Sequence, residues 1–251
     1  MVKVKGEAYF GRMERVNTLS KTLVICEKPD QARQYAEAMS DTSKFKKSNG
    51  YLENDTFVFT YAFGHLVTSK GPKDYKEFSE QPRKGWDWPY IPFFPPNGSL
   101  DFHITDKGKA DQMKVIGSLL KRPDVSLVIN GADAGREGEL IFWEIYDYFK
   151  CKKPVKRLWC STYVKEDVQK AFRNLRDETY FLSRRDSAYS RQFADWVLGM
   201  NLTIGFSIKA NMGRALHVGR VQTPTIALLV QRRLERENFI PEEYFEMEVE
   251  F

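Results

Sequence analysis

Short apolar runs alternate with amphipathic stretches through the first 160 residues, and this alternation strongly restricts the fold. The runs at residues 22–26, 57–62 and 126–130 have the length and β-branched content of buried strands. The stretches at 29–39 and 107–120 carry apolar residues at helical spacing. Strands that alternate with helices predict an α/β fold, with a largely parallel sheet and helices on both faces.

The pattern changes near residue 165, where strand signals become few. Helix-like stretches follow at residues 165–176, 183–201 and 221–236. We therefore expect an extension at residues 1–20, an α/β domain over 21–164 and a mainly α-helical domain over 165–251.

Two segments depart from this scheme. Residues 70–97 contain six prolines, which predicts a long irregular loop that carries aromatic side chains. Residues 244–251 alternate apolar and acidic side chains as a strand does, but no partner strand follows. We therefore expect a C-terminally truncated helical domain that belongs to a larger protein.

Composition excludes several classes of protein. Hydrophobic residues make up 42% of the chain, which excludes a disordered or collagen-like protein. No apolar run approaches the ~18–20 residues that a membrane helix needs. The three cysteines form no CxxC pair, so a zinc ribbon or a disulfide scaffold is not expected. These features predict a cytoplasmic protein without a membrane partner.

The basic excess is confined to one segment. Residues 151–220 hold 14 lysines and arginines against 6 acidic residues. Such a segment fits contact with a polyanion, and a solvated basic helix face explains the charge equally well. Aromatic residues are interleaved with the arginines between 184 and 222, which suits single-stranded nucleic acid. For Trp196, helical spacing favours core packing instead.

Carboxylates follow two of the predicted strands. Glu27 ends the first apolar run, and Asp133 follows the run at 126–130, with Glu137 and Glu139 just beyond. Functional groups gather outside the carboxyl ends of strands in open α/β sheets, so these acids are expected to converge. Converging carboxylates repel one another unless a cation intervenes, which predicts a site for Mg²⁺ that acts on a phosphodiester.

A simpler explanation exists for each acid alone. Glu137 and Glu139 would complement a helix N-terminus, and Asp133 would cap a turn. The joint occurrence of two acidic strand ends, with Lys28 and Arg136 as adjacent phosphate-seeking cations, favours the functional interpretation.

These motifs carry a family resemblance. Residues 23–29 read Leu-Val-Ile-Cys-Glu-Lys-Pro and residues 133–139 read Asp-Ala-Gly-Arg-Glu-Gly-Glu, which resemble the two halves of a Toprim domain in type IA DNA topoisomerases. Further segments resemble the family in the family's order, at residues 62–66, 157–162, 194–203 and 218–225. The Glu-Lys-Pro and Gly-His-Leu details are most similar to bacterial topoisomerase III.

The resemblance implies roles for the Toprim residues. Glu27 matches a proposed general acid/base that also lies near the metal, and Lys28 matches a lysine that steadies the scissile phosphate. Asp133 and Glu137 match the metal-associated acids, with Arg136 near the phosphate. Gly135 stands where the family often has a second aspartate, which leaves a second metal ion without a side-chain oxygen.

The resemblance also implies DNA-binding residues. Arg191 and Asp195 match groove-lining positions, and Arg220 and Gln222 match backbone-contacting residues of the Gly-Arg-Val-Gln-Thr-Pro segment. His65 matches a Toprim-side histidine, although by itself it fits an ordinary structural histidine. Ile204 replaces an arginine that relatives often have.

The family's nucleophile is a tyrosine in a Tyr-x-Arg-Thr/Ser context, and none of the 12 tyrosines here has that context. The resemblance therefore implies the N-terminal part of an Mg²⁺-dependent topoisomerase III-like enzyme that binds single-stranded DNA and is inactive alone. No phosphate-binding Gly-x-x-x-x-Gly-Lys-Ser/Thr loop occurs, which agrees with ATP independence. The sequence identifies no helicase partner. A Toprim nuclease or primase and a stand-alone DNA-binding module are the alternatives.

Overall fold

The computed structural model describes residues 20–41, 43–76 and 91–251. The chain forms two compact units. The first comprises the chain up to Lys70 together with Asp101–Arg191, and the second comprises Gly71–Leu100 with Gln192–Phe251. The predicted extension at residues 1–20 lies outside the described residues except for Ser20. No helix in the described ranges is long and apolar enough to cross a membrane.

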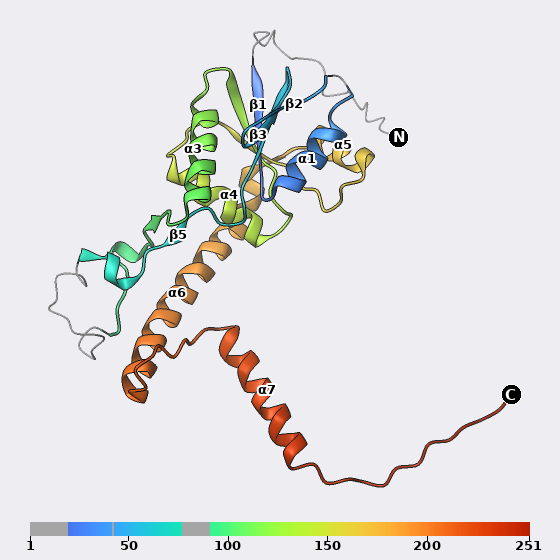
Figure 1. Cartoon of the computed structure of the whole chain (residues 1–251). Helices are drawn as coiled ribbons and strands as arrows, with labels where there is room; N and C mark the ends of the chain where they lie inside the picture. The colour runs from blue at the N-terminus through green and yellow to red at the C-terminus, as the bar shows by residue number, and fades with distance from the viewer. Residues whose placement is uncertain (1–19, 42, 77–90) are drawn as a thin grey trace, which may run out of the picture. The chain divides into compact units, whose positions relative to one another are not determined.

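A mixed sheet forms the centre of the first unit (Figure 1). Within the described residues its strand order is β2-β3-β4-β1-β7-β8-β9. The central neighbours β4, β1, β7 and β8 run parallel, and antiparallel strands lie at both edges. The strands are β1 (Lys21–Cys26), β2 (Lys46–Ser48), β3 (Tyr51–Glu53), β4 (Phe57–Tyr61), β7 (Val125–Asn130), β8 (Val155–Arg157) and β9 (Arg176–Asp177). A separate antiparallel pair joins β5 (Thr68–Ser69) to β6 (Phe102–His103).

The register aligns the carboxyl ends of the central strands. Cys26 of β1 pairs with Tyr61 of β4, and Ile25 pairs with Asn130 of β7. The residues that follow these three strands are therefore brought to one edge of the sheet.

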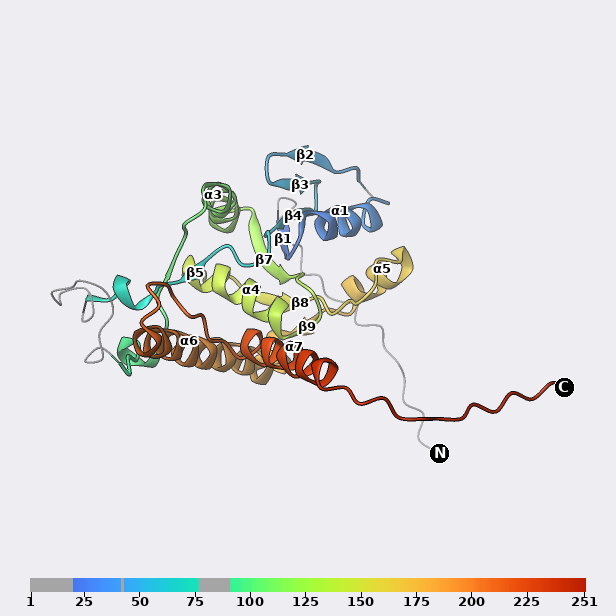
Figure 2. The same ribbon diagram turned by 60° about the horizontal axis from the view of Figure 1, so that its bottom comes forward.

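Helices cover both faces of the sheet because the side chains of β1 alternate between two cores. Leu23 and Ile25 point into one core, with α3 (Lys107–Lys121) and α4 (Arg136–Tyr148). Val24 and Cys26 point into the other, with α1 (Pro29–Ala38) and α5 (Lys165–Arg173). Figure 2 shows α1 and α3 on opposite sides of β1. The predicted α/β class is confirmed.

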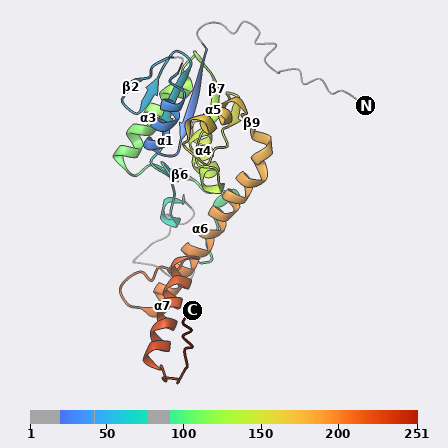
Figure 3. The same cartoon turned by 90° about the vertical axis from the view of Figure 1, so that its right-hand side faces the viewer.

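The later part of the chain is mainly helical, as predicted. It contains a short 3₁₀ turn η4 (Glu178–Phe181), then α6 (Leu182–Ala210), drawn as one unbroken helix in Figure 3, and α7 (Gln222–Glu237). The two units divide within α6. Trp196 is buried against the rings of Tyr75 and Phe93, so its predicted core role is confirmed.

The structure corrects one local prediction and shows one hairpin that was not predicted. Residues 244–251 are exposed and form no strand, because no neighbouring strand satisfies their backbone groups. The β2–β3 hairpin was not predicted, since its short strands are not apolar. Half of the predicted loop at 70–97 lies outside the described residues. Its described parts contain two short 3₁₀ turns, η1 (Pro72–Asp74) and η3 (Pro96–Gly98).

Candidate functional site

The predicted Toprim residues follow the carboxyl ends of parallel strands. Glu27 and Lys28 follow β1, His65 lies shortly after β4, and Asp133 lies shortly after β7. Backbone pairing continues beyond the strand ends, where the Gly64 amide donates to the Glu27 carbonyl at 3.3 Å. The sheet thus holds these segments side by side.

Lys28 joins two of the predicted acids. Its ammonium Nζ lies 2.8 Å from Asp133 Oδ2 and 3.3 Å from Glu27 Oε1. The hydrogen bond with Asp133, and then the charge of Glu27, raise the pKa of Lys28. Glu27 is buried, whereas Lys28 and Asp133 are partly exposed. The ammonium therefore occupies the place between two carboxylates where a cation is electrostatically favoured.

Gln31 is a site residue that sequence reasoning missed. Its amide nitrogen donates to Asp133 Oδ1 at 3.0 Å, and its Oε1 accepts the Glu27 backbone N–H at 2.8 Å. The side chain is 1% exposed on α1. A polar residue on the otherwise apolar inward face of this helix is the signal that could have identified it.

His65 lies between two carboxylates of α4. Its Nδ1 is 2.7 Å from Glu144 Oε2, and its Nε2 is 2.8 Å from Glu137 Oε1. The hydrogen bond with buried Glu144 and the charges of both acids raise the pKa of His65 to about 9, against the opposing effect of burial. Glu144 was not predicted, because its position in an apolar helix gives no functional signal.

The geometry divides the predicted metal ligands into two groups. Glu137 accepts a hydrogen bond from His65, whereas Glu27 and Asp133 contact Lys28. Among residues 20–41, 43–76 and 91–251, no three acidic, histidine or cysteine side chains gather as a metal cluster. Metal binding by these residues stays a prediction.

The raised pKa of His65 predicts pH-dependent stability. Because the folded pKa of about 9 exceeds the unfolded value of about 6.5, the stabilisation is fully present below pH ~6.5 and is lost as pH rises through ~9. We expect His65→Gln to cost about 1–2 kcal/mol at pH 6, discounted because a third of the side chain is exposed, and much less at pH 9.5. Urea unfolding of both proteins at these pH values measures the difference. An equal difference in unfolding free energy at both pH values would contradict the raised pKa of His65.

Glu139 does not join the other acids, which corrects the expectation that it would converge with them. It is 1% exposed, and its Oε1 accepts from Arg157 Nε at 2.5 Å. Its Oε2 accepts from Asn130 Nδ2 at 3.1 Å and from Trp143 Nε1 at 3.3 Å. The carboxylate is therefore neutralised inside the domain.

Two glycines of the acidic motif differ in what they allow. A Cβ on Gly138 would lie 2.2 Å from the Asp133 carbonyl oxygen, so only glycine permits this close approach. A Cβ on Gly135 would meet no atom within 4 Å. A side chain would therefore fit at position 135, so lack of space does not explain why glycine stands where the family often has a second aspartate.

The remaining predicted residues lie on α4, α6 and α7 or in the turn before α7. Arg136 begins α4, Arg191 lies on α6, and Gln222 begins α7, all with exposed side chains. Arg220 forms a two-point ion pair with Asp195, at 2.7 and 3.1 Å. Their DNA contacts stay a prediction.

One arginine of the basic segment is engaged inside the first unit. The Arg185 guanidinium lies 3.9 Å from the ring centroid of Trp143 and 2.9 Å from Asp147. Tyr189 also donates to Asp147, at 3.1 Å. These side chains stabilise the start of α6 against α4.

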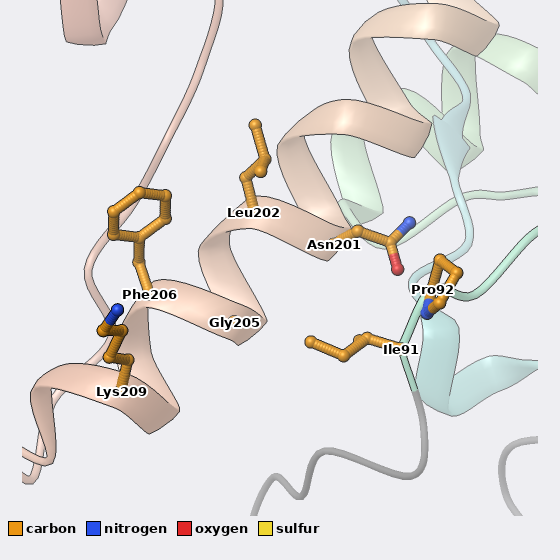
Figure 4. Close-up of a pocket in the computed structure, with 7 residues that line it drawn as sticks. All are labelled: Ile91, Pro92, Asn201, Leu202, Gly205, Phe206 and Lys209. Atoms are coloured by element: carbon orange, nitrogen blue, oxygen red, sulfur yellow. The ribbon is translucent and has the colours of Figure 1, made fainter.

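An apolar pocket of about 440 Å³ lies in the second unit (Figure 4). Ile91 and Pro92 face α6 there. Asn201 lies in the segment 194–203, which resembles the family. Its side chain accepts a hydrogen bond from the Phe93 backbone amide at 2.6 Å and donates one to the Phe93 carbonyl at 2.8 Å. Asn201 thus fastens the chain after Pro92 to α6.

Comparisons with known proteins agree with this architecture. The Toprim domain family matches residues 22–163, and a family described as DNA topoisomerase matches residues 182–251. The chain is 38% identical to DNA topoisomerase 3 of Staphylococcus haemolyticus over 230 residues, which cover 92% of the chain and 31% of that relative. It is 36% identical to DNA topoisomerase 3 of Bacillus subtilis over 228 residues, 90% of the chain and 30% of that relative.

A solved structure shows the same fold. The full-length topoisomerase I of Thermotoga maritima matches with a TM-score of 0.57 and 21% identity, over 88% of this chain and 31% of that one. The chain thus spans about three tenths of the length of its curated relatives. The Toprim match, the DNA topoisomerase match and the identity to these relatives show that the chain belongs to the type IA DNA topoisomerase family, on the side of the bacterial topoisomerase III enzymes.

Proposed function

We propose that this chain supplies the acid/base and metal-binding part of a topoisomerase III-like enzyme that cuts and reseals one DNA strand without ATP. The observation that carries the proposal is the contact of Glu27, Lys28 and Asp133 at the carboxyl edge of the sheet. Buried Glu27 suits proton transfer at the sugar oxygen of the scissile bond. Lys28 and Arg136 suit binding of the scissile phosphate.

Mg²⁺ fits the two carboxylates that Lys28 now joins. Magnesium accepts one or two carboxylates and fills its remaining positions with water and phosphate oxygens, so Glu27 and Asp133 are sufficient ligands. Glu137 instead accepts a hydrogen bond from His65 with one of its carboxylate oxygens. When bound, the ion supplies positive charge that offsets the charge of the phosphodiester. Gly135 provides no ligand for a second ion.

Lys28 is expected to compete with the metal. Lys28→Met removes the ammonium that contacts both acids, so Mg²⁺ affinity should rise about fivefold, the equivalent of about 1 kcal/mol for a partly exposed ion pair. Titration calorimetry measures the change. Lys156→Met is the matched control, because Lys156 forms a similarly exposed ion pair with Asp177. Unchanged or weaker Mg²⁺ binding by Lys28→Met would contradict the competition.

We further propose that the chain binds DNA, preferentially as a single strand, in the cytoplasm. Arg191, Asp195, Arg220 and Gln222 would contact the backbone from the helical region, and His65 would lie near the phosphate on the Toprim side. The charge and aromatic content of the basic segment support this DNA binding. We also propose that the Toprim domain ends at residue 164 and the DNA-groove domain follows, which the end of the Toprim match at residue 163 supports.

We infer that the tyrosine nucleophile of the enzyme lies outside this chain, because none of the 12 tyrosines has the family's sequence context. Tyr189 is followed by Ser-Arg, the nearest match to the family's context, but Gln192 comes next. Burial raises the pKa of Tyr189, and its hydroxyl donates to Asp147. A phenol held in this way is a poor nucleophile.

Replacement of the matching N-terminal part of Bacillus subtilis DNA topoisomerase 3 by this chain tests the function. We expect the chimera to relax negatively supercoiled plasmid with Mg²⁺, and Glu27→Gln in it to lower the rate at least ~100-fold. The 251-residue chain alone should shift a labelled oligonucleotide on a gel without relaxing plasmid or forming a covalent adduct. Strand cutting by the chain alone would overturn the proposal in favour of a Toprim nuclease, and an adduct would reveal an overlooked nucleophile.

A further inference from the structure

A buried arginine holds the backbone that carries Asp133. Arg157, at the end of β8, is 1% exposed. Its guanidinium donates to four carbonyl oxygens in addition to Glu139. These belong to Asn130 at 3.0 Å, Ala132 at 2.7 Å, Asp133 at 2.7 Å and Leu158 at 2.8 Å.

Three of the four carbonyls belong to the segment 130–133, which is the last residue of β7 and the start of the loop toward α4. The last residue of this segment, Asp133, presents the carboxylate that contacts Lys28. Arg157 therefore touches the backbone of Asp133 and leaves the Asp133 carboxylate free for the site. Only the planar fork of a guanidinium reaches this many acceptors at fixed angles, and a lysine ammonium does not reproduce it.

Glu139 fixes the orientation of Arg157. One carboxylate oxygen accepts from Arg157 Nε, and the other accepts from Asn130 and Trp143. Because the Glu139 carboxylate neutralises the Arg157 guanidinium, Arg157 adds no net charge to the acidic site. The loop is thus connected to α4 through a chain of buried, satisfied polar groups.

We propose that Arg157 is a positioning residue that holds the loop at 130–133 so that Asp133 faces Glu27, and thereby sets the affinity of the site for a divalent cation. The inference deepens the proposed function, because it rests on Asp133 being a metal ligand. Groups that orient ligands from behind influence metal affinity in this way.

Arg157→Lys is the central test, because it keeps the charge opposite Glu139 and removes the fork. We expect Mg²⁺ affinity to fall ~10-fold by calorimetry, with a matching loss in Mn²⁺ binding followed by electron paramagnetic resonance. The double variant Arg157→Met with Glu139→Gln removes the fork without leaving a buried charge, and should weaken binding similarly. Circular dichroism confirms that each variant is folded.

Lys153→Met is the matched control. Lys153 also donates to two backbone carbonyls, those of Arg122 and Val125, each at 2.5 Å, but at the opposite end of β7. It should lower thermal stability and leave Mg²⁺ affinity unchanged. This control separates positioning of the site from general support of the sheet.

The outcomes distinguish the two levels of inference. If Asp133→Asn abolishes Mg²⁺ binding while both folded Arg157 variants bind within twofold of the parent, the positioning role is wrong and the metal site stands. Equal weakening by Lys153→Met and Arg157→Lys would also overturn the positioning role. If the parent chain binds no Mg²⁺, or Asp133→Asn leaves binding unchanged, the metal part of the proposed function fails, and this inference fails with it.

Discussion

Glu139→Ala is expected to lower the free energy of unfolding by about 3–5 kcal/mol, because it leaves the Arg157 guanidinium charged and without its counterion in the core. Both side chains are almost fully excluded from solvent, at 1% and 2% exposure, so water cannot replace the lost partner. Asn130 and Trp143 lose an acceptor at the same time. Urea denaturation followed by circular dichroism measures the loss.

The double variant Arg157→Met with Glu139→Gln is the control for this prediction. It removes both charges and keeps a side-chain oxygen for Asn130 and Trp143, so most of the lost stability should return. A Glu139→Ala protein as stable as the parent would mean that the pair contributes no net stabilisation. A double variant less stable than Glu139→Ala would place the effect in the loop carbonyls rather than in the unpaired charge.

Binding of single-stranded DNA should be tight at low salt and weak at high salt. With about five phosphate contacts, affinity is expected to fall ~100-fold between 50 and 200 mM salt, and to exceed the affinity for duplex DNA at either concentration. Arg191→Ala and Arg220→Ala should each weaken binding and reduce the salt slope by about 0.7. Removal of Arg220 also removes its ion pair with Asp195, which adds repulsion toward phosphate. Fluorescence anisotropy with a labelled oligonucleotide provides both quantities.

Arg185→Ala is the comparison variant. The Arg185 side chain lies over the ring of Trp143 and is 25% exposed, half the exposure of Arg220, so its removal should change the salt slope much less. Preference for duplex DNA, or binding that does not depend on salt, would show that the binding surface lies elsewhere. An equal loss in all three arginine variants would indicate general electrostatic attraction rather than contacts at Arg191 and Arg220.

The local periodicity of apolar residues was sufficient to predict the main strands and helices of the fold. The apolar runs that became β1, β4 and β7, and the amphipathic stretches that became α1, α3 and α4, are legible in the chain because each buries its own side chains at its own period. Because strand and helix alternation predicts a largely parallel sheet, Glu27 and Asp133 were expected at one edge of it, whereas the pairing of β1 with β7 is seen only in the structure. The motifs around these acids also identified the family.

Which side chains contact one another at the site could be seen only in the folded chain. Glu27, Lys28 and Asp133 were expected near one another, but the ammonium between the two acids, and the Gln31 amide beneath them, depend on side chains 102 to 106 residues apart. Likewise Glu137 and Glu139 are two residues apart, yet one pairs with His65 and the other with buried Arg157.

The physical reason is that sequence spacing reports which face of an element is buried, but not what lies across from it. On α4, Glu137 points to the exposed edge and Glu139 into the core, so helix rotation relative to the sheet decides which carboxylate remains available for chemistry. The same limit applies to residues 71–76 and 91–100, which belong to the same compact unit as the chain after Arg191 rather than to that of their sequence neighbours. Composition and motif thus indicate the family, and long-range packing assigns each charge its partner.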